Sequence, residues 1–110
     1  MHGRADFDVT VEELADLRAA DAPHCVLDVR EPHETAICAL PGALLTPLAQ
    51  VPTQIEALPR DRPIFVLCHH GVRSAMVVDY LRRQGLPNAY NIAGGIDAWS
   101  RRIDPSVPTY

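Results

Sequence analysis

The stretch that decides the fold is residues 63–74, Pro-Ile-Phe-Val-Leu-Cys-His-His-Gly-Val-Arg-Ser. Its apolar run at 64–67 is typical of a strand buried on both faces of a parallel sheet. Cys68 follows this run directly, and a helical spacing of apolar residues begins after Arg73. A thiol is therefore expected between the carboxyl end of a strand and the amino end of a helix. Ligands bind at this edge of α/β sheets, and the helix dipole there favours an anion such as a thiolate.

Short apolar runs and helical patterns alternate along the rest of the chain. Further strands are predicted at 7–9, 25–29, 44–45 and 89–92. Helices are predicted at 11–20, 48–58, 73–83 and 95–99, with a short helical turn ending at 36. Thr10 and Glu13 form a capping box at the start of the first helix. This alternation predicts an α/β fold with a mainly parallel sheet.

Length and cysteine content limit the classes of protein to which this chain can belong. One hundred and ten residues suit a single domain spanning 1–110, in which residues 1–5 are expected to fray. No apolar run is long enough to span a bilayer, and the opening Met-His-Gly-Arg-Ala-Asp-Phe-Asp is no signal segment. Three cysteines, an odd number, favour reduced thiols over a disulfide framework. A cytoplasmic protein without a membrane partner is therefore expected.

The distribution of charge is more informative than its sum. The net charge of −4 argues against nucleic acid as a partner. Residues 60–83 nevertheless hold five arginines and two aspartates, a net of +3. This segment could attract a small anion to Cys68, because screening removes the influence of exposed charges beyond about 8–10 Å. The alternative is a chance excess of arginine on a solvated helix face.

The residues after Cys68 suit a thiolate and an anionic substrate. Gly71 permits a sharp turn in which successive N–H groups can converge on the sulfur. These donors, the helix amino end and the charge of Arg73 all favour the thiolate form. The planar fork of Arg73 fits an oxyanion such as a sulfonate, phosphate or arsenate. A lone cysteine at a strand end is more often a small buried hydrophobe, but the combination with Gly71 and Arg73 favours a nucleophile.

The number of residues between Cys68 and Arg73 limits the reactions that the loop is expected to support. Cysteine phosphatases have a comparable loop with one more residue between cysteine and arginine, whereas four residues separate Cys68 from Arg73. The shorter ring fits a single added sulfur better than a phosphoryl group, which leaves a phosphatase or an arsenate reductase as the alternative. No metal is expected, because His69 and His70 are adjacent and the sequence has no Cys-x-x-Cys pair.

Four motifs in order give the sequence a resemblance to the single-domain rhodaneses, which are sulfurtransferases. Residues 27–30, Leu-Asp-Val-Arg, followed by Glu34, resemble the family's Asp-Val-Arg…Glu segment, and the Pro-Gly-Ala at 41–43 resembles its turn. The Cys-His-His-Gly-Val-Arg-Ser at 68–74 resembles its active-site loop, and the Ala-Gly-Gly-Ile-Asp-Ala-Trp at 93–99 resembles its closing segment. The resemblance implies a rhodanese-like three-layer domain, with a central, mainly parallel sheet of about five short strands flanked by helices.

The resemblance also implies a persulfide cycle that needs no cofactor. The catalytic Cys68 would take sulfane sulfur from thiosulfate or a persulfide donor and pass it to cyanide or a thiol. The loop residues expected to bind the substrate are His69, His70, Gly71, Val72, Arg73 and Ser74. Arg30 is a further candidate, because strand ends converge there, but it could equally pair with Asp28 or Glu34. Those two carboxylates are expected to give structural support.

Several roles stay open at this point. The rings of His69 and His70 could donate to a substrate or mainly shape the loop. Cys38 could resolve the persulfide, or it could simply lie apart from Cys68. The tail at 104–110 should lie over the surface or reach a partner, and it resembles tails of rhodanese domains in sulfur-carrier pathways. A sulfur-relay module fed by a partner protein is therefore an alternative to a small-molecule enzyme, and an inert binding module is a third reading.

Overall fold

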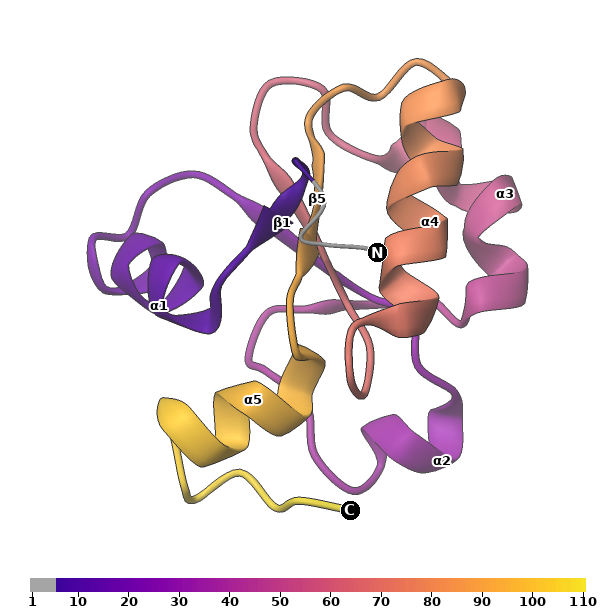
Figure 1. The fold of residues 1–110 in the computed structure, drawn as a ribbon. Helices are drawn as coiled ribbons and strands as arrows, with labels where there is room; N and C mark the ends of the chain where they lie inside the picture. The colour runs from indigo at the N-terminus through magenta and orange to yellow at the C-terminus, as the bar shows by residue number, and fades with distance from the viewer. Residues whose placement is uncertain (1–5) are drawn as a thin grey trace.

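The computed structural model describes residues 6–110, and within them five strands form one sheet whose neighbours are all parallel (Figure 1). The order across the sheet is β1-β5-β4-β2-β3. The strands are β1 (Asp8–Val9), β2 (Cys25–Asp28), β3 (Leu44–Leu45), β4 (Ile64–Leu67) and β5 (Ala89–Ile92). The predicted α/β class with a parallel sheet is confirmed, and the strand before Cys68 is the central one. The expectation for residues 1–5 lies outside the described residues.

Helices occupy the four connections between strands that are consecutive in the chain, and a further helix follows the last strand. They are α1 (Val11–Ala19), α2 (Pro32–Thr35), α3 (Val51–Gln54), α4 (Val72–Arg83) and α5 (Gly95–Arg102). The capping box of Thr10 and Glu13 at the start of α1 is present as predicted. The fifth helix continues past Trp99 to Arg102, and an ion pair between Asp97 and Arg101 spans its added turn.

The single helix predicted over 48–58 is wrong. Only α3 is α-helical, and the 3₁₀ turns Leu48–Gln50 and Ile55–Ala57 flank it. Pro52 has no N–H with which to bond the carbonyl of Leu48, and the N–H of Val51 bonds that carbonyl in the 3₁₀ manner. The apolar spacing correctly indicated which residues pack toward the core. It takes no account of the N–H that Pro52 lacks, and a continuous α-helix would need that donor.

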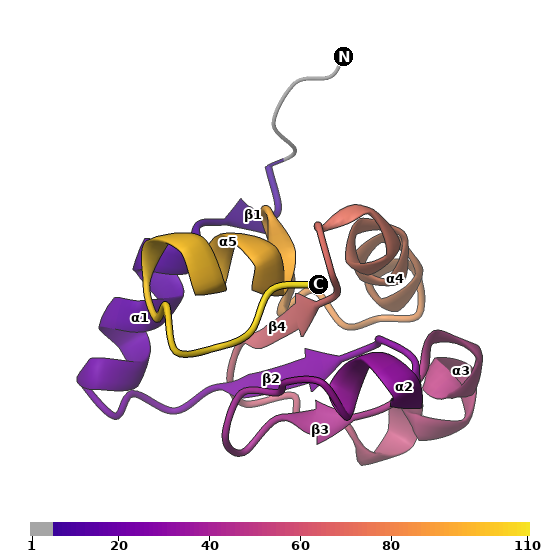
Figure 2. The same cartoon turned by 90° about the horizontal axis from the view of Figure 1, so that it is seen from below.

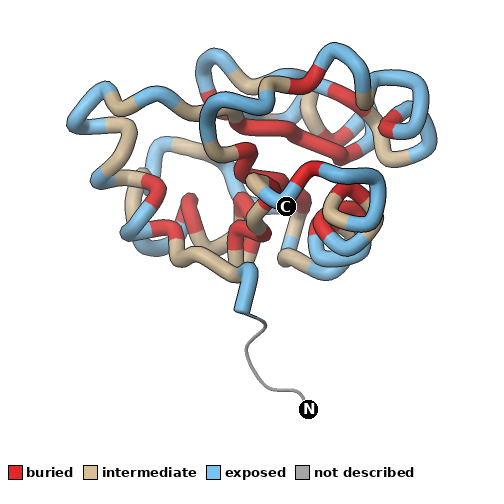
Figure 3. The backbone as a smooth tube through the Cα atoms, turned by 90° about the horizontal axis from the view of Figure 1, so that it is seen from above, coloured by how far each residue is buried: buried red, intermediate tan, exposed pale blue. Residues whose placement is uncertain are grey.

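Side chains of the central strand alternate between two apolar cores. Ile64, Val66 and Cys68 belong to the core beneath α3 and α4, whereas Phe65 and Leu67 belong to the core beneath α1 and α5. Figure 1 shows these two helix pairs on opposite sides of the sheet, and Figure 3 shows the buried backbone concentrated between them. The alternation therefore decides that the thiol of Cys68 faces α4.

The tail after α5 folds back beneath the carboxyl ends of the strands. The N–H groups of Ile103 and Asp104 both bond the carbonyl of Trp99, and the N–H of Val107 bonds the carbonyl of Asp104. Val107 also packs against the core beneath α1 and α5. Figure 2 shows the tail, in yellow, ending near the loop that follows β4. Of the two destinations expected for the tail, it takes the surface of its own chain.

No helix in the described range 6–110 is both long enough and apolar enough to cross a membrane.

Candidate active site

The sulfur of Cys68 is buried but sits among polar groups. Only 1% of the residue is exposed, and the residue counts as part of an apolar core. Its Sγ nevertheless accepts hydrogen bonds from the main-chain N–H groups of Gly71, at 3.1 Å, and Ser74, at 3.4 Å. The hydroxyl of Ser74 lies 3.2 Å from the same sulfur. Donors at these positions, at the first turn of α4, stabilise a negative charge on sulfur more than a neutral thiol.

The first turn of α5 holds the Cys68 loop in this shape. The N–H groups of Ile96 and Asp97 donate to the carbonyls of Cys68 and His69, at 2.9 and 3.1 Å. Because these carbonyls point at α5, the N–H groups that follow can turn toward the sulfur. Gly95 has a φ of +62°, and a Cβ on it would overlap the same two carbonyl oxygens. The glycine pair before α5 is therefore part of the support for the loop.

The loop is also fixed by Asn91, which the sequence analysis did not single out. The buried hydroxyl of Ser74 donates to Oδ1 of Asn91. The amide nitrogen of Asn91 donates to Asp8 and to the carbonyl of Gly71, which orients Oδ1 toward Ser74. While the Ser74 hydrogen is used in this way, the thiol of Cys68 can donate to Ser74. In the thiolate form the hydroxyl can instead turn its hydrogen to the sulfur. A polar residue inside the apolar run 89–92 was the pattern that could have revealed Asn91.

Arg73, which lies in the first turn of α4, pairs with Glu34 from α2. Its two terminal nitrogens lie 2.6 and 2.9 Å from the two carboxylate oxygens. The N–H of Glu31 also donates to Glu34 at 3.0 Å. These hydrogen bonds, chiefly those from Arg73, hold the pKa of Glu34 well below its usual range. The hydrogen bonds to Glu34 raise the pKa of Arg73. The side chain of Arg73 keeps 32% of its surface exposed.

Arg30 takes one of the two arrangements left open by the sequence. Its side chain has no exposed surface, and its guanidinium binds the carboxylate of Asp28 at 2.6 to 3.2 Å. It also donates to the carbonyl of Cys38 at 2.8 Å. Burial acts to lower the pKa of Arg30, but the hydrogen bonds that it donates to Asp28 and Tyr110 outweigh this effect and raise that pKa. Arg30 therefore braces the edge of the sheet and offers no surface to a substrate.

Tyr110 joins these groups, although no sequence pattern pointed to it. Its hydroxyl donates to Glu34 at 2.8 Å and accepts from Arg30 at 3.1 Å. Its ring stacks on the ring of His69, with centroids 3.8 Å apart and planes 5° from parallel. Burial, the largest influence, raises the pKa of Tyr110 to about 12. A residue from the tail thus reaches the loop, α2 and the end of β2.

The remaining predicted residues have less specific surroundings. The ring of His70 lies 3.9 Å from that of His69 and is largely exposed, and Val72 is exposed at the start of α4. Nε2 of His69 is buried and has no hydrogen-bond partner among the described residues. Cys38 bonds the carbonyl of Pro108 in the tail. These contacts do not test the roles assigned to the two rings or to Cys38, which stay predictions.

The positive stretch at 60–83 does not converge on the sulfur. Arg60 bonds the carbonyl of Gly85, and Arg62 pairs with Asp61. The other two arginines are engaged as well, Arg82 over the ring of Phe7 and Arg83 with Asp79. Apart from Arg73, each of these arginines has a local partner of its own, Arg82 is half-buried, and the other three are exposed.

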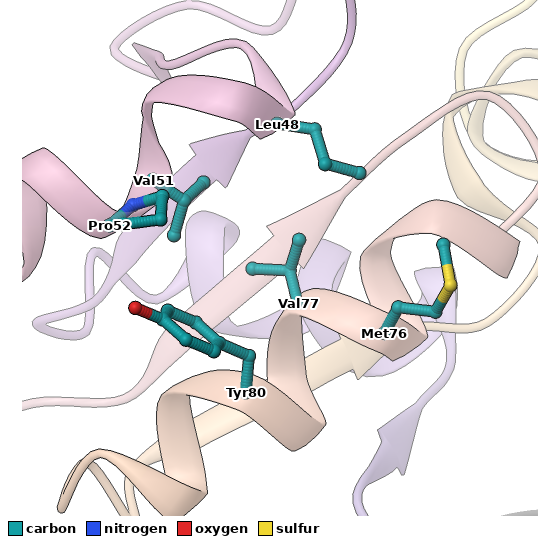
Figure 4. Close-up of a pocket in the computed structure, with 6 residues that line it drawn as sticks. All are labelled: Leu48, Val51, Pro52, Met76, Val77 and Tyr80. Carbon is teal, nitrogen blue, oxygen red and sulfur yellow. The ribbon is translucent and has the colours of Figure 1, made fainter.

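Two other features lie beside the site. Ring nitrogens of His69 and His70 and a carboxylate oxygen of Asp97 fall within 4.8 Å of one another, but Arg101 already binds that carboxylate at 3.0 Å. An apolar hollow of about 260 Å³ opens between α3 and α4 (Figure 4). Its lining residues are Leu48, Val51, Pro52, Met76, Val77 and Tyr80. The hollow has no thiol among its lining residues, and the polar groups around a cysteine lie at the Cys68 loop instead.

The family of this chain follows from a family model that matches most of its length. A family model described as the rhodanese-like domain matches residues 10–102. This chain belongs to the rhodanese-like family. The resemblance expected from the four motifs is therefore confirmed, and the fold and loop described above are those of a rhodanese-like domain.

Relatives and solved structures agree with this assignment. The chain is 37% identical over 91 residues to a sulfurtransferase from Allochromatium vinosum, covering 82% of this chain and 85% of that protein. It is 30% identical over 122 residues to the adenylyltransferase and sulfurtransferase MOCS3 of Arabidopsis thaliana, covering 96% of this chain. The crystal structure of a rhodanese-like domain protein from Staphylococcus aureus superposes with a TM-score of 0.81 at 32% identity, covering 94% and 97% of the two chains.

These relatives support a sulfurtransferase function for this rhodanese-like chain. The chain spans only 26% of the length of the Arabidopsis MOCS3, however, and less than a third of other long relatives. What those longer proteins do as a whole does not transfer with the domain alone.

Proposed function

We propose that this rhodanese-like chain transfers sulfane sulfur through a persulfide on Cys68. The observation that carries the proposal is the surroundings of the sulfur, which accepts from the N–H groups of Gly71 and Ser74 at the start of α4, the helix that also carries Arg73. Such donors favour a thiolate nucleophile and then an anionic outer sulfur.

The reaction balances as two displacements at sulfur. The Cys68 thiolate attacks the outer sulfur of thiosulfate, a new S–S bond forms, and the S–S bond of thiosulfate breaks. Sulfite leaves with that electron pair, and Cys68 carries a persulfide anion. Cyanide or a thiolate then attacks the outer sulfur and regenerates the Cys68 thiolate. The two half-reactions predict ping-pong kinetics.

Arg73 is the proposed binding group for the sulfonate of the donor. Its fork is occupied by Glu34, but the side chain is partly exposed and retains N–H hydrogens that the carboxylate does not use. Ser74 would stabilise the thiolate by turning its hydroxyl from Asn91 to the sulfur. Val72, His69 and His70 would contribute loop shape around the donor.

The proposal is tested by intact-mass measurement after treatment with thiosulfate. The wild-type chain should gain one sulfur, and the thiosulfate–cyanide assay should show turnover. Cys68→Ser should abolish both, while Cys25→Ser serves as the matched control and should keep them. A sulfur adduct that persists in Cys68→Ser would move the chemistry to another thiol. Turnover of an aryl phosphate in place of thiosulfate would favour the phosphatase alternative.

A second candidate is a sulfur-relay module whose donor is a protein. It is favoured by relatives named as adenylyltransferase and sulfurtransferase, of which this chain matches only a part. In that case a persulfidated donor protein, such as a cysteine desulfurase, should load Cys68 faster than millimolar thiosulfate does. Equal or slower loading by that donor protein would favour the small-molecule enzyme.

A further inference from the structure

The hydroxyl of Tyr110 lies between two ion pairs that come from different parts of the chain. On one side it accepts from Arg30, whose own partner is Asp28. On the other side it donates to Glu34, whose partner is Arg73. The phenol therefore links the buried pair at the end of β2 with the partly exposed pair of Arg73 and Glu34.

The contacts of Glu34 show what this link can do. Oε1 accepts from the N–H of Glu31 and from Arg73, whereas Oε2 accepts from Tyr110 and from Arg73. Each oxygen thus has one fixed donor besides the arginine. Without the phenol, Oε2 would be held by Arg73 alone, so the carboxylate could rotate and pull the guanidinium with it.

Contacts outside the active-site loop set the position of Tyr110. The thiol of Cys38 donates to the carbonyl of Pro108 at 3.3 Å, and Val107 is packed in the core beneath α1 and α5. The ring then stacks on His69, the residue after the nucleophile. The tail is therefore anchored before it reaches the site, and its phenol can act as a fixed reference for Glu34.

We infer that Tyr110 is a positioning residue for the sulfur donor, because its hydroxyl fixes Glu34 and through it the Arg73 guanidinium that binds an anionic donor. The inference rests on the proposed sulfur transfer and deepens it by adding a residue to the donor subsite. It concerns the thiosulfate half-reaction, in which a sulfonate must be held, and not the attack of cyanide on the persulfide.

The test is the variant Tyr110→Phe, which keeps the ring on His69 and removes only the hydroxyl. Loss of one hydrogen bond to a charged group predicts a fall of about tenfold in kcat/KM for thiosulfate. The kcat/KM for cyanide, measured in the same ping-pong analysis, should stay unchanged. Tyr80→Phe removes a hydroxyl from the hollow of Figure 4 and is the matched control, with both constants unchanged.

A double-mutant cycle separates positioning from general loosening of the fold. In an Arg73→Ala background, Tyr110→Phe should have no further effect on kcat/KM for thiosulfate, because the group it positions is gone. Equal losses in both half-reactions, or a loss that persists in that background, would overturn the inference. So would an unchanged kcat/KM for thiosulfate in Tyr110→Phe while the wild type forms the persulfide. A wild type that forms no persulfide and shows no turnover would instead overturn the proposed function itself.

Discussion

Arg30 follows β2 and Arg73 lies in the first turn of α4, and each is bound to a carboxylate, yet they differ in what they can do. Arg30 and Asp28 are fully enclosed, whereas 32% of the Arg73 side chain reaches solvent beside Glu34. Arg30 has further fixed acceptors, among them the carbonyl of Cys38. An enclosed guanidinium cannot exchange its partner for a substrate without unfolding its surroundings. A partly exposed one can, which favours a structural role for Arg30 and the proposed recognition role for Arg73.

The largest expected effect belongs to the enclosed pair. Arg30→Met would leave the carboxylate of Asp28 buried without its partner, and breaking a buried ion pair in this way costs about 3–5 kcal/mol. Urea unfolding should show that loss in the free energy of unfolding. The double variant Arg30→Met with Asp28→Leu should recover much of it, because no uncompensated charge remains. If the free energy of unfolding of Arg30→Met falls by less than about 1 kcal/mol, the Arg30–Asp28 pair contributes no more than an exposed ion pair does.

Arg73→Ala should show the opposite pattern, with a large loss of activity and a small loss of stability. Removing one group that binds developing or transferred charge costs about 2.7–4 kcal/mol of barrier, roughly 10²–10³ in kcat/KM for thiosulfate. The free energy of unfolding should fall by about 1 kcal/mol or less, as for other partly exposed ion pairs. Arg73→Lys keeps the charge but not the fork, and should fall between wild type and alanine. Wild-type rates in Arg73→Ala would remove this arginine from the donor site.

The two arginines also show which parts of the fold and the site could be predicted from the sequence. The order of the strands' apolar runs, the glycine at 71 and the helix predicted from 73 are local patterns, and they predicted the fold and the helix that follows Cys68. The pairing of Arg73 with Glu34 joins residues far apart in the chain, and it depends on where α2 packs. Nothing in the spacing distinguishes this outcome from an arginine that points at the sulfur.

Asn91 and Tyr110 were missed for a related reason. Each acts through contacts with residues that are distant in sequence, Asn91 with Asp8 and Gly71, and Tyr110 with Arg30 and Glu34. In a sequence, an asparagine in a short strand does not by itself indicate a functional role. The same is true of a tyrosine that follows two prolines. Only the folded arrangement shows that both end at the Cys68 loop.

The smallest expected effect is the response of the exposed pair to acid. Because Arg73 holds the pKa of Glu34 below its usual range, the folded state binds a proton at this group less readily than the unfolded chain does. The stabilisation is therefore fully present above the unfolded pKa of about 4.3, and it is lost as the pH falls below that value. Between pH 6 and pH 3 the wild type should lose up to about 1 kcal/mol more of its free energy of unfolding than Glu34→Gln does.

The comparison needs a control for the general effect of acid on the other carboxylates. Glu56→Gln removes an exposed carboxylate from the turn after α3, so its loss between pH 6 and pH 3 should match that of the wild type. If Glu34→Gln also matches the wild type, the Arg73–Glu34 pair contributes nothing to folding that depends on its charge. Arg73 would then be held only loosely, and Tyr110 would have no fixed carboxylate to act upon. An acid-dependent difference confined to Glu34→Gln would instead identify this pair as a folded-state constraint on the guanidinium, in contrast to the enclosed pair at Arg30.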